Sequence, residues 1–272
     1  MNAKDKSYQN KSTIVLPVIL LVDASGSMDA YDVYGGWTKM ETVQRAFLDI
    51  ARLLVEYQQD DNVEVKVSVL CFHTDTEWLC ENVEPEKLFN VHFTPQGVTC
   101  MGDAFQKLEK KLNSEELGLE DVYQYKPTVM ILLTDGGDAG GGISSQEGIQ
   151  ILRQNHWFAK GLRIVVAVGD DIDVDMETLQ AFTGSQYAVI KVDQVMVLQH
   201  LLERSIDYDF SDIALDRGAY DVDIESIRLR DSFNRSARET GEIIQRYIQD
   251  KTFYDVFDVG DIHCFDEEND IL

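Results

Sequence analysis

One apolar run followed by oxygen-bearing side chains constrains the fold of this chain more than any other stretch. Leu16 to Met28 reads LPVILLVDASGSM, and every residue from Pro17 to Val22 is apolar. A continuous run of Val, Ile and Leu that ends in turn residues is typical of a strand buried on both faces. Such a strand lies inside a sheet that is covered by helices, so the run predicts an α/β fold.

Side chains with oxygen atoms follow this strand at alternate positions. They are Asp23, Ser25 and Ser27. Oxygen ligands suit a hard divalent cation, for which we expect Mg²⁺, with Mn²⁺ or Ca²⁺ as alternatives. The other interpretation is a capped helix start, in which Ser25 or Ser27 is the N-cap and Asp23 only closes the strand. The stretch alone leaves both interpretations open.

The charge of the chain argues against two classes of partner. The 272 residues carry 24 Lys and Arg against 49 Asp and Glu, a formal net charge of -25. Nucleic acids and anionic membrane surfaces attract clustered cations, so neither is an expected partner. The sequence shows no signal-peptide pattern, no apolar run near the ~20 residues of a membrane span, and scattered cysteines without a CxxC pair. We therefore expect a cytoplasmic protein with reduced thiols.

The rest of the chain predicts strands that alternate with amphipathic helices. Residues 73–95 are ambiguous, with short strands at 76–79 and 90–93 or a helical turn at 84–89. The resulting fold class is α/β, with a doubly wound, mostly parallel sheet flanked by helices, as in Rossmann-like folds. The other expected strands are 64–72, 127–134, 163–169 and 187–192, and the expected helices are 39–57, 101–113, 146–160, 176–182 and 195–204.

This domain is predicted to span residues 14–205, between a polar tail at 1–13 and an acidic extension at 206–272. The apolar spacing within the extension predicts a helix at about 224–248. One interpretation is that the extension packs back on the domain. The other is that it recruits a partner, or that one of its carboxylates occupies the domain's own metal site.

Two more candidate ligands lie at positions where the fold gathers residues. Asp135 ends the strand at 127–134, and Thr99 lies in the loop before the helix at 101–113. In open α/β sheets, ligands bind beyond the carboxyl ends of the strands. That edge would collect Asp135 with the residues that follow Val22, and the Thr99 loop would border them. The alternative for Thr99 is an N-cap and nothing more.

These residues together resemble a known family. Asp23-x-Ser25-x-Ser27, a later Gly-x-Thr that ends at Thr99, and Thr-Asp-Gly at Asp135 resemble the von Willebrand factor A domain with its metal-ion-dependent adhesion site. The resemblance covers residues 16–204. The runs LPVILLVDASGSM and PTVMILLTDG are also similar to bacterial TerY-type proteins of tellurite-resistance and stress-response clusters.

The resemblance implies a role for each of these residues. Ser25 and Ser27 would bind the cation directly through their hydroxyls, and Thr99 would bind it directly or through water. Asp23 and Asp135 would act mostly through water. One position on the cation would stay open for an Asp or Glu of a partner protein. The implied function is a non-catalytic, metal-dependent protein-interaction module, a scaffold or adaptor in a bacterial stress-response or defence system.

The sequence departs from the family pattern in two places. The loop from Asp29 to Trp37 is longer and more aromatic than expected, and Val98 replaces the glycine usual before the threonine. The loop is either a tolerated surface insertion or part of the binding surface. On the second interpretation we expect partner contacts from Asp29, Asp32, Tyr34, Trp37 and Asp138.

The alternative function is a metal-dependent phosphatase or hydrolase that uses Asp23 as its nucleophile. A nucleophilic aspartate of the haloacid-dehalogenase kind has a second acid two residues on, where this chain has Ser25. The glycine cluster Gly136–Gly142 lacks the Lys-Ser/Thr ending of a phosphate-binding loop, and the sequence has no GxSxG nucleophile elbow. We therefore expect a binding protein that is not an enzyme.

Overall fold

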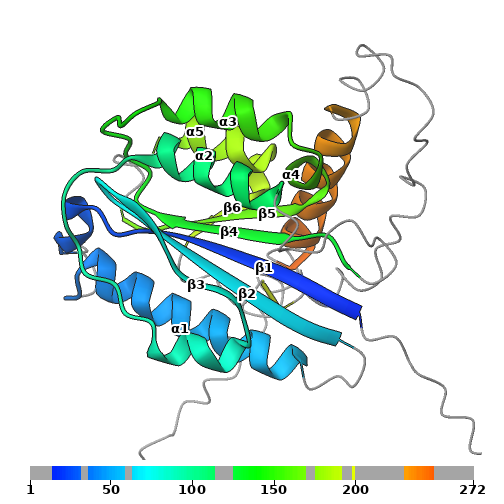
Figure 1. The fold of residues 1–272 in the computed structure, drawn as a ribbon, viewed down its shortest axis with the longest axis horizontal. Helices are drawn as coiled ribbons and strands as arrows, with labels where there is room; N and C mark the ends of the chain where they lie inside the picture. The colour runs from blue at the N-terminus through cyan, green and yellow to red at the C-terminus, as the bar shows by residue number, and fades with distance from the viewer. Residues whose placement is uncertain are drawn as a thin grey trace, which may run out of the picture.

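A six-stranded sheet forms the centre of the protein (Figure 1). The computed structural model describes residues 14–31, 36–58, 63–113, 125–169, 175–191, 198–199 and 230–247. The strand order is β3-β2-β1-β4-β5-β6, and every neighbouring pair is parallel except β2 with β3. The predicted doubly wound, mostly parallel sheet is confirmed. The strands are β1 (Ile14–Asp23), β2 (Val63–Phe72), β3 (Thr76–Val83), β4 (Val129–Thr134), β5 (Leu162–Ala167) and β6 (Val189–Lys191).

Strand β1 shows why its sequence is apolar without alternation. Leu20 and Val22 pack into the core on one face of the sheet, whereas Ile19 and Leu21 pack into the core on the other. Because helices cover both faces, each successive side chain meets an apolar environment. The strand thus carries Asp23 from the core to the carboxyl edge of the sheet.

Helices cover the two faces unequally. The helix α1 (Lys39–Gln58) and the 3-10 helix η2 (Pro85–Asn90) lie on one face, and four helices lie on the other (Figure 1). Hydrophobic residues from each group join the corresponding core. The four are α2 (Met101–Leu112), α3 (Ser145–Arg153), α4 (His156–Lys160) and α5 (Met176–Thr183).

The prediction of one helix over residues 146–160 is wrong. The chain forms α3, breaks, and starts α4 after Asn155. The Asn155 side-chain oxygen accepts hydrogen bonds from the backbone N–H groups of Trp157 at 2.9 Å and Phe158 at 3.0 Å. This N-cap stabilises a new helix start, which the apolar spacing alone does not reveal.

The ambiguous segment and the last predicted elements also differ from expectation in detail. The strand expected at 76–79 extends through Val83 as β3, and the helical turn expected at 84–89 is η2, whereas 90–93 is not a strand. The strand expected at 187–192 is the 3-10 helix η4 (Gln186–Ala188) followed by the short β6. Most of the helix expected at 195–204 lies outside the described residues.

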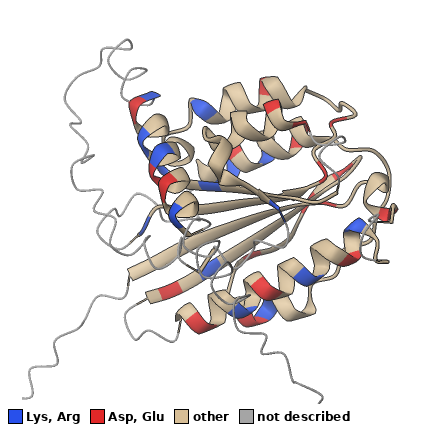
Figure 2. Cartoon of the chain, turned by 180° about the vertical axis from the view of Figure 1, so that it is seen from behind, with Lys and Arg blue, Asp and Glu red and all other residues tan. Residues whose placement is uncertain are grey.

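Residues 230–247 form a helix that packs on the domain, within the region where the sequence predicts one at about 224–248. Phe233 belongs to one core and Ile244 to the other, so this helix contributes to both faces. It carries both positive and negative residues along its length (Figure 2). The remainder of the extension lies outside the described residues, as does the predicted tail at 1–13.

Two further findings concern the environment of the chain. Within the described part, no helix is both long and apolar enough to cross a membrane. Cys71, Cys80 and Cys100 are free thiols. Burial raises the pKa of the Cys71 thiol to about 12, so that side chain behaves as a small apolar group instead of a reactive thiolate.

Candidate metal centre

The carboxyl edge of the sheet brings three loops together. The turn after β1 contains both serines, and its Gly26 N–H donates to the Gly97 carbonyl at 3.1 Å. The loop after β4 is tied to the same place, because the Ala139 N–H donates to the Thr99 carbonyl at 3.0 Å. These backbone bonds hold the serine turn, the Thr99 loop and the Asp135 loop beside one another, as the fold predicted.

Asp23 is fully buried at the end of β1, with 0% of its surface exposed. Its Oδ1 accepts from the Ser25 N–H at 2.9 Å, and its Oδ2 accepts from the Thr134 hydroxyl at 2.7 Å. The pKa of Asp23 is raised to about 6: burial raises it most, the hydrogen bonds from Thr134 and Ser25 oppose that rise, and the charge of Asp135 adds to it. A buried carboxylate in this setting favours a nearby positive charge.

The two serine hydroxyls face each other instead of capping a helix. Ser25 holds the N-cap position of the 3-10 helix η1 (Gly26–Asp29), but its side chain makes no capping hydrogen bond. The Ser25 and Ser27 Oγ atoms lie 3.0 Å apart, with Ser25 buried and Ser27 exposed. This geometry places two neutral oxygens side by side at the mouth of the site, and it gives the N-cap interpretation no support.

Thr99 is buried in a loop whose backbone is held by the turn between β2 and β3. The N-cap position of α2 belongs to Cys100, which makes no side-chain cap bond, so Thr99 is not the N-cap. The Thr74 hydroxyl accepts from the Val98 N–H at 3.1 Å. Gly97 has φ +65, and a Cβ there would lie 2.1 Å from the Thr74 hydroxyl oxygen, so only glycine fits this close approach.

Asp135 has one paired oxygen and one unpaired oxygen. Its Oδ2 lies 3.1 Å from the Lys39 ammonium, whereas its Oδ1 is buried and has no hydrogen-bond partner. An unpaired buried carboxylate oxygen is unfavourable unless a water or a cation completes it. Lys39 is not among the residues that the sequence predicts at the site. The available signal was a lysine in the first turn of a helix, where the helix dipole disfavours positive charge.

Asp138, one of the predicted partner contacts, is engaged with the backbone. Its Oδ1 accepts from the N–H groups of Met101 and Gly140, both at 3.3 Å, and its Oδ2 accepts from the Ser145 N–H at 2.9 Å. The carboxylate thereby joins the starts of α2 and α3 beside the site. Asp138 therefore has a structural role at these two helix starts, and a partner contact through Asp138 stays a prediction.

The other predicted partner contacts flank the serine turn. Asp29 is exposed at the end of η1. Trp37 is 42% exposed, and the Arg45 guanidinium lies 3.6 Å from the centre of its ring. Asp32 and Tyr34 lie outside the described residues. Trp37 and Asp29 are accessible for a partner, although nothing in the fold requires one there.

The donor set fits a hard cation. Among the described residues, no group of three or more His, Cys, Asp and Glu side chains is placed to hold a metal. The site at the carboxyl edge is of another kind, since it combines two carboxylates with the hydroxyls of Ser25, Ser27 and Thr99. All five side chains offer oxygen, the ligand atom of Mg²⁺ and Ca²⁺. The unpaired Asp135 Oδ1 is the feature of this structure that a cation, or water bound to it, would complete.

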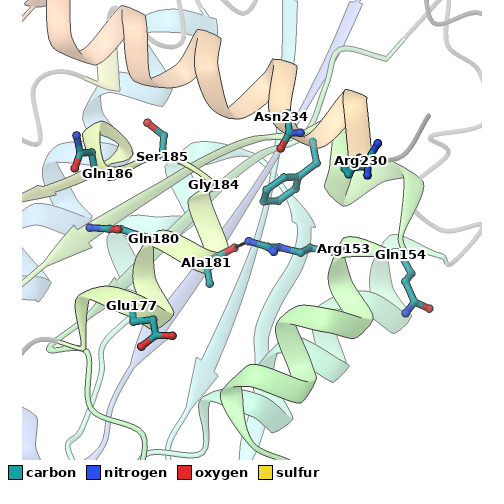
Figure 3. Close-up of a pocket in the computed structure, with 11 residues that line it drawn as sticks. Arg153, Gln154, Glu177, Gln180, Ala181, Gly184, Ser185, Gln186, Arg230 and Asn234 are labelled. Atoms are coloured by element: carbon teal, nitrogen blue, oxygen red, sulfur yellow. Dashed lines mark hydrogen bonds between the residues drawn. The ribbon is translucent and has the colours of Figure 1, made fainter. Parts of the chain in front are cut away.

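A separate pocket of about 590 Å³ lies between α3, α5 and the helix at 230–247 (Figure 3). None of the predicted site residues lines it. The Arg153 guanidinium donates to the Ala181 carbonyl at 2.8 Å and lies 4.6 Å from the centre of the Phe233 ring. Arg153 therefore links three elements, and the pocket is the junction where the helix at 230–247, here called the C-terminal helix, meets the domain.

Comparisons with known proteins give similarities in fold only. No protein-family model matches the sequence, and no curated protein matches it. Solved structures that match include an aerotolerance-related membrane protein from Bacteroides fragilis NCTC 9343, at 17% identity and a TM-score of 0.48, over 71% of this chain and 98% of the other. BatB from Bacteroides thetaiotaomicron matches at 16% identity and a TM-score of 0.47, over 71% of this chain and 100% of the other.

A third match is a von Willebrand factor type A protein from Catenulispora acidiphila, at 17% identity and a TM-score of 0.46. It covers 72% of this chain and 43% of the other.

Proposed function

We propose that this chain is a metal-dependent protein-binding module that holds Mg²⁺ at the carboxyl edge of its sheet and binds an acidic side chain of a partner protein there. The observation that carries the proposal is the buried, unpaired Oδ1 of Asp135, beside a second buried carboxylate at Asp23. Both acids lie at one edge with three hydroxyl side chains. The sequence resemblance to the von Willebrand factor A domain supports the same site.

Each residue has a proposed part. The hydroxyls of Ser25 and Ser27 would bind the cation directly, and the Thr99 hydroxyl would approach it from the facing loop. Asp23 and Asp135 would orient its water ligands and offset its charge. When bound, the cation supplies electrostatic attraction for a carboxylate oxygen of the partner. Since few direct ligands are carboxylates, much of the cation's charge remains available for that contact.

The state of Asp23 favours binding over catalysis. Both of its oxygens accept hydrogen bonds, and the side chain has no exposed surface. A nucleophilic oxygen must reach the substrate directly, and the buried Asp23 carboxylate has no exposed surface from which to do so. On the resemblance to TerY-type proteins, we also propose a role as a cytoplasmic scaffold or adaptor in a bacterial stress-response or defence system.

The test is removal of the two serine hydroxyls. The double variant Ser25→Ala, Ser27→Ala should lower Mg²⁺ affinity by at least about a hundredfold in calorimetric titration, because direct ligands matter more than outer ones. Ser185→Ala, which removes a hydroxyl from the turn after α5, is the matched control and should bind like the wild type. Equal Mg²⁺ binding by the double variant and the wild type would reject the site.

The same proteins test the partner. Immobilised wild type should capture a protein from a bacterial lysate with MgCl₂ present and release it with EDTA, whereas the double serine variant should capture none under either condition. Capture that is insensitive to both EDTA and the serine substitutions would remove the metal from the proposed function.

A further inference from the structure

Lys39 is a buried positive charge within the proposed cation site. Its side chain is 10% exposed, that of Asp135 is 6% exposed, and the Lys39 Nζ lies 3.1 Å from the Asp135 Oδ2. Gly169, with φ +107, lies against the lysine, and a Cβ there would come within 3.0 Å of the Lys39 Cε. The chain therefore leaves space for a lysine side chain to reach the aspartate across the sheet edge.

The start of α1 fixes the lysine in this position. Thr38 and Glu41 form a reciprocal cap, in which the Thr38 N–H donates to Glu41 Oε2 at 2.7 Å and the Glu41 N–H donates to Thr38 Oγ1 at 3.1 Å. The Lys39 N–H donates to the Ala30 carbonyl at 2.9 Å. A buried ammonium in the first turn opposes the helix dipole and loses its hydration, so Asp135 is what makes the placement tolerable.

The charges of the site can then be summed. Asp23 and Asp135, when ionised, and Lys39 give the site a charge of one negative unit. A divalent cation would change this to one positive unit, whereas without the lysine the loaded site would be neutral. A positive loaded site attracts a carboxylate, which is otherwise repelled by a chain of net charge -25.

We propose that Lys39 sets the balance of this site between cation and partner: it weakens the binding of the cation alone and strengthens the binding of an acidic side chain to the loaded site. It also holds the Asp135 Oδ2, which leaves the Oδ1 as the free oxygen of that carboxylate. Cation and carboxylate thus bind best as a pair. This inference rests on the proposed function and names a residue outside the ligand set that the sequence predicted.

Neutral replacements of Lys39 give effects of opposite sign in two measurements. Lys39→Met and Lys39→Gln should bind Mg²⁺ about tenfold more tightly than the wild type in calorimetric titration, because a nearby positive charge is gone. Acetate, the simplest carboxylate probe, should bind the Mg²⁺-loaded variants about tenfold more weakly in an NMR titration. The glutamine variant keeps a donor for the Asp135 Oδ2, so it serves if the methionine variant does not fold.

Two control variants separate site charge from total charge. Arg52→Met removes one exposed positive charge from the same helix and should leave both affinities within twofold of the wild type. Lys39→Arg keeps the charge and should stay near the wild type in both measurements.

The outcomes distinguish this inference from the function on which it rests. If the wild type binds no Mg²⁺, the proposed function and this inference both fail. If the wild type binds Mg²⁺ and the neutral Lys39 variants bind it equally or more weakly, Lys39 does not oppose the cation and this inference alone is overturned. Acetate affinity that does not fall in those variants would likewise overturn this inference alone.

Discussion

The two edges of the sheet both bury charge, but the chain completes only one of them by itself. At the amino end of β5, the Arg163 side chain is among the largest that are fully buried. Its guanidinium donates to the carbonyls of Phe158, Gly161 and Phe233 at 2.5, 2.9 and 3.1 Å. At the carboxyl edge, by contrast, Asp135 keeps an unpaired oxygen.

The two edges differ in how completely their buried charges are paired within the chain. The face of the Arg163 guanidinium is covered by the rings of Phe158 and Phe233, at 5.0 and 4.2 Å, and only its Nε lacks a hydrogen-bond partner. Because Phe233 comes from the C-terminal helix, this arginine joins that helix to the domain. At the other edge, Asp135 pairs with Lys39 through one oxygen, and its second oxygen is the one that we propose for a ligand from outside.

The largest effect is expected from Arg163→Met. The change leaves several buried carbonyls without their donor and loosens the C-terminal helix, so we expect a loss of about 3 kcal/mol or more in unfolding free energy by urea denaturation. Mg²⁺ affinity should not change. Arg235→Met, an exposed change on the same helix, should stay within about 0.5 kcal/mol of the wild type. A loss below about 1 kcal/mol for Arg163→Met would show that this edge is not a structural clamp.

The second prediction concerns pH at the amino edge. Burial, together with the charge of Lys160, lowers the pKa of His156 to about 4, so the folded state binds a proton less readily than the unfolded state below pH 6.5. Stability from this group is complete above pH 6.5 and is lost as the pH falls toward 4, by about 3 kcal/mol at most.

His156→Gln is the matched variant, because it cannot take up that proton. The unfolding free energy of the wild type minus that of the variant should fall, by up to about 3 kcal/mol, as the pH falls from about 7 to about 4. Parallel stability curves over this range would mean that His156 protonates as easily in the folded protein as in the unfolded one.

A charge-removing substitution at the carboxyl edge should have the opposite sign to that of Arg163→Met. Because burial raises the pKa of Asp23 to about 6, the ionised side chain destabilises the metal-free protein above that pH and not below about 4. Asp23→Asn should therefore stabilise the protein by about 2 kcal/mol in EDTA at about pH 7.5, measured by urea denaturation. Added MgCl₂ should stabilise only the wild type. A variant that is less stable than the wild type in EDTA would show that the ionised Asp23 does not destabilise the metal-free protein.

The smallest effect is expected at the surface loop beside the site. Trp37→Ala removes the ring beneath the Arg45 guanidinium, an exposed contact that contributes about 0.5–1 kcal/mol. Mg²⁺ affinity should remain that of the wild type. If the loop belongs to the binding surface, capture of the partner in MgCl₂ should fall in this variant but not in Tyr31→Ala, which removes another exposed ring of the same loop. Unchanged capture by Trp37→Ala would leave the loop as a surface insertion.

Local pattern and fold logic were sufficient for much of this molecule. The unbroken apolar run before Asp23 predicted a strand buried on both faces, and the sheet class followed from the alternation of strands and helices. The grouping of Asp23 with Asp135 followed as well, since parallel strands end at one edge.

Contacts between distant segments were not predictable in the same way. Lys39 and Asp135 are 96 residues apart, and the sequence presented Lys39 only as the first residue of a helix. Arg163 lay in an apolar run and gave no sign that carbonyls from two other elements would surround it. The apolar spacing continues across Asn155 and so does not reveal the break there, although the asparagine itself is a possible cap.

The central claim is that a cation binds among Ser25, Ser27, Thr99 and the free oxygen of Asp135. The most direct measurement is a crystal structure of the full chain soaked in MnCl₂, with anomalous diffraction collected at the manganese absorption edge. We predict an anomalous peak at the carboxyl edge of the sheet, in contact with both serine hydroxyls. Ordered site residues with no peak among them, or a peak only elsewhere on the protein, would contradict the claim.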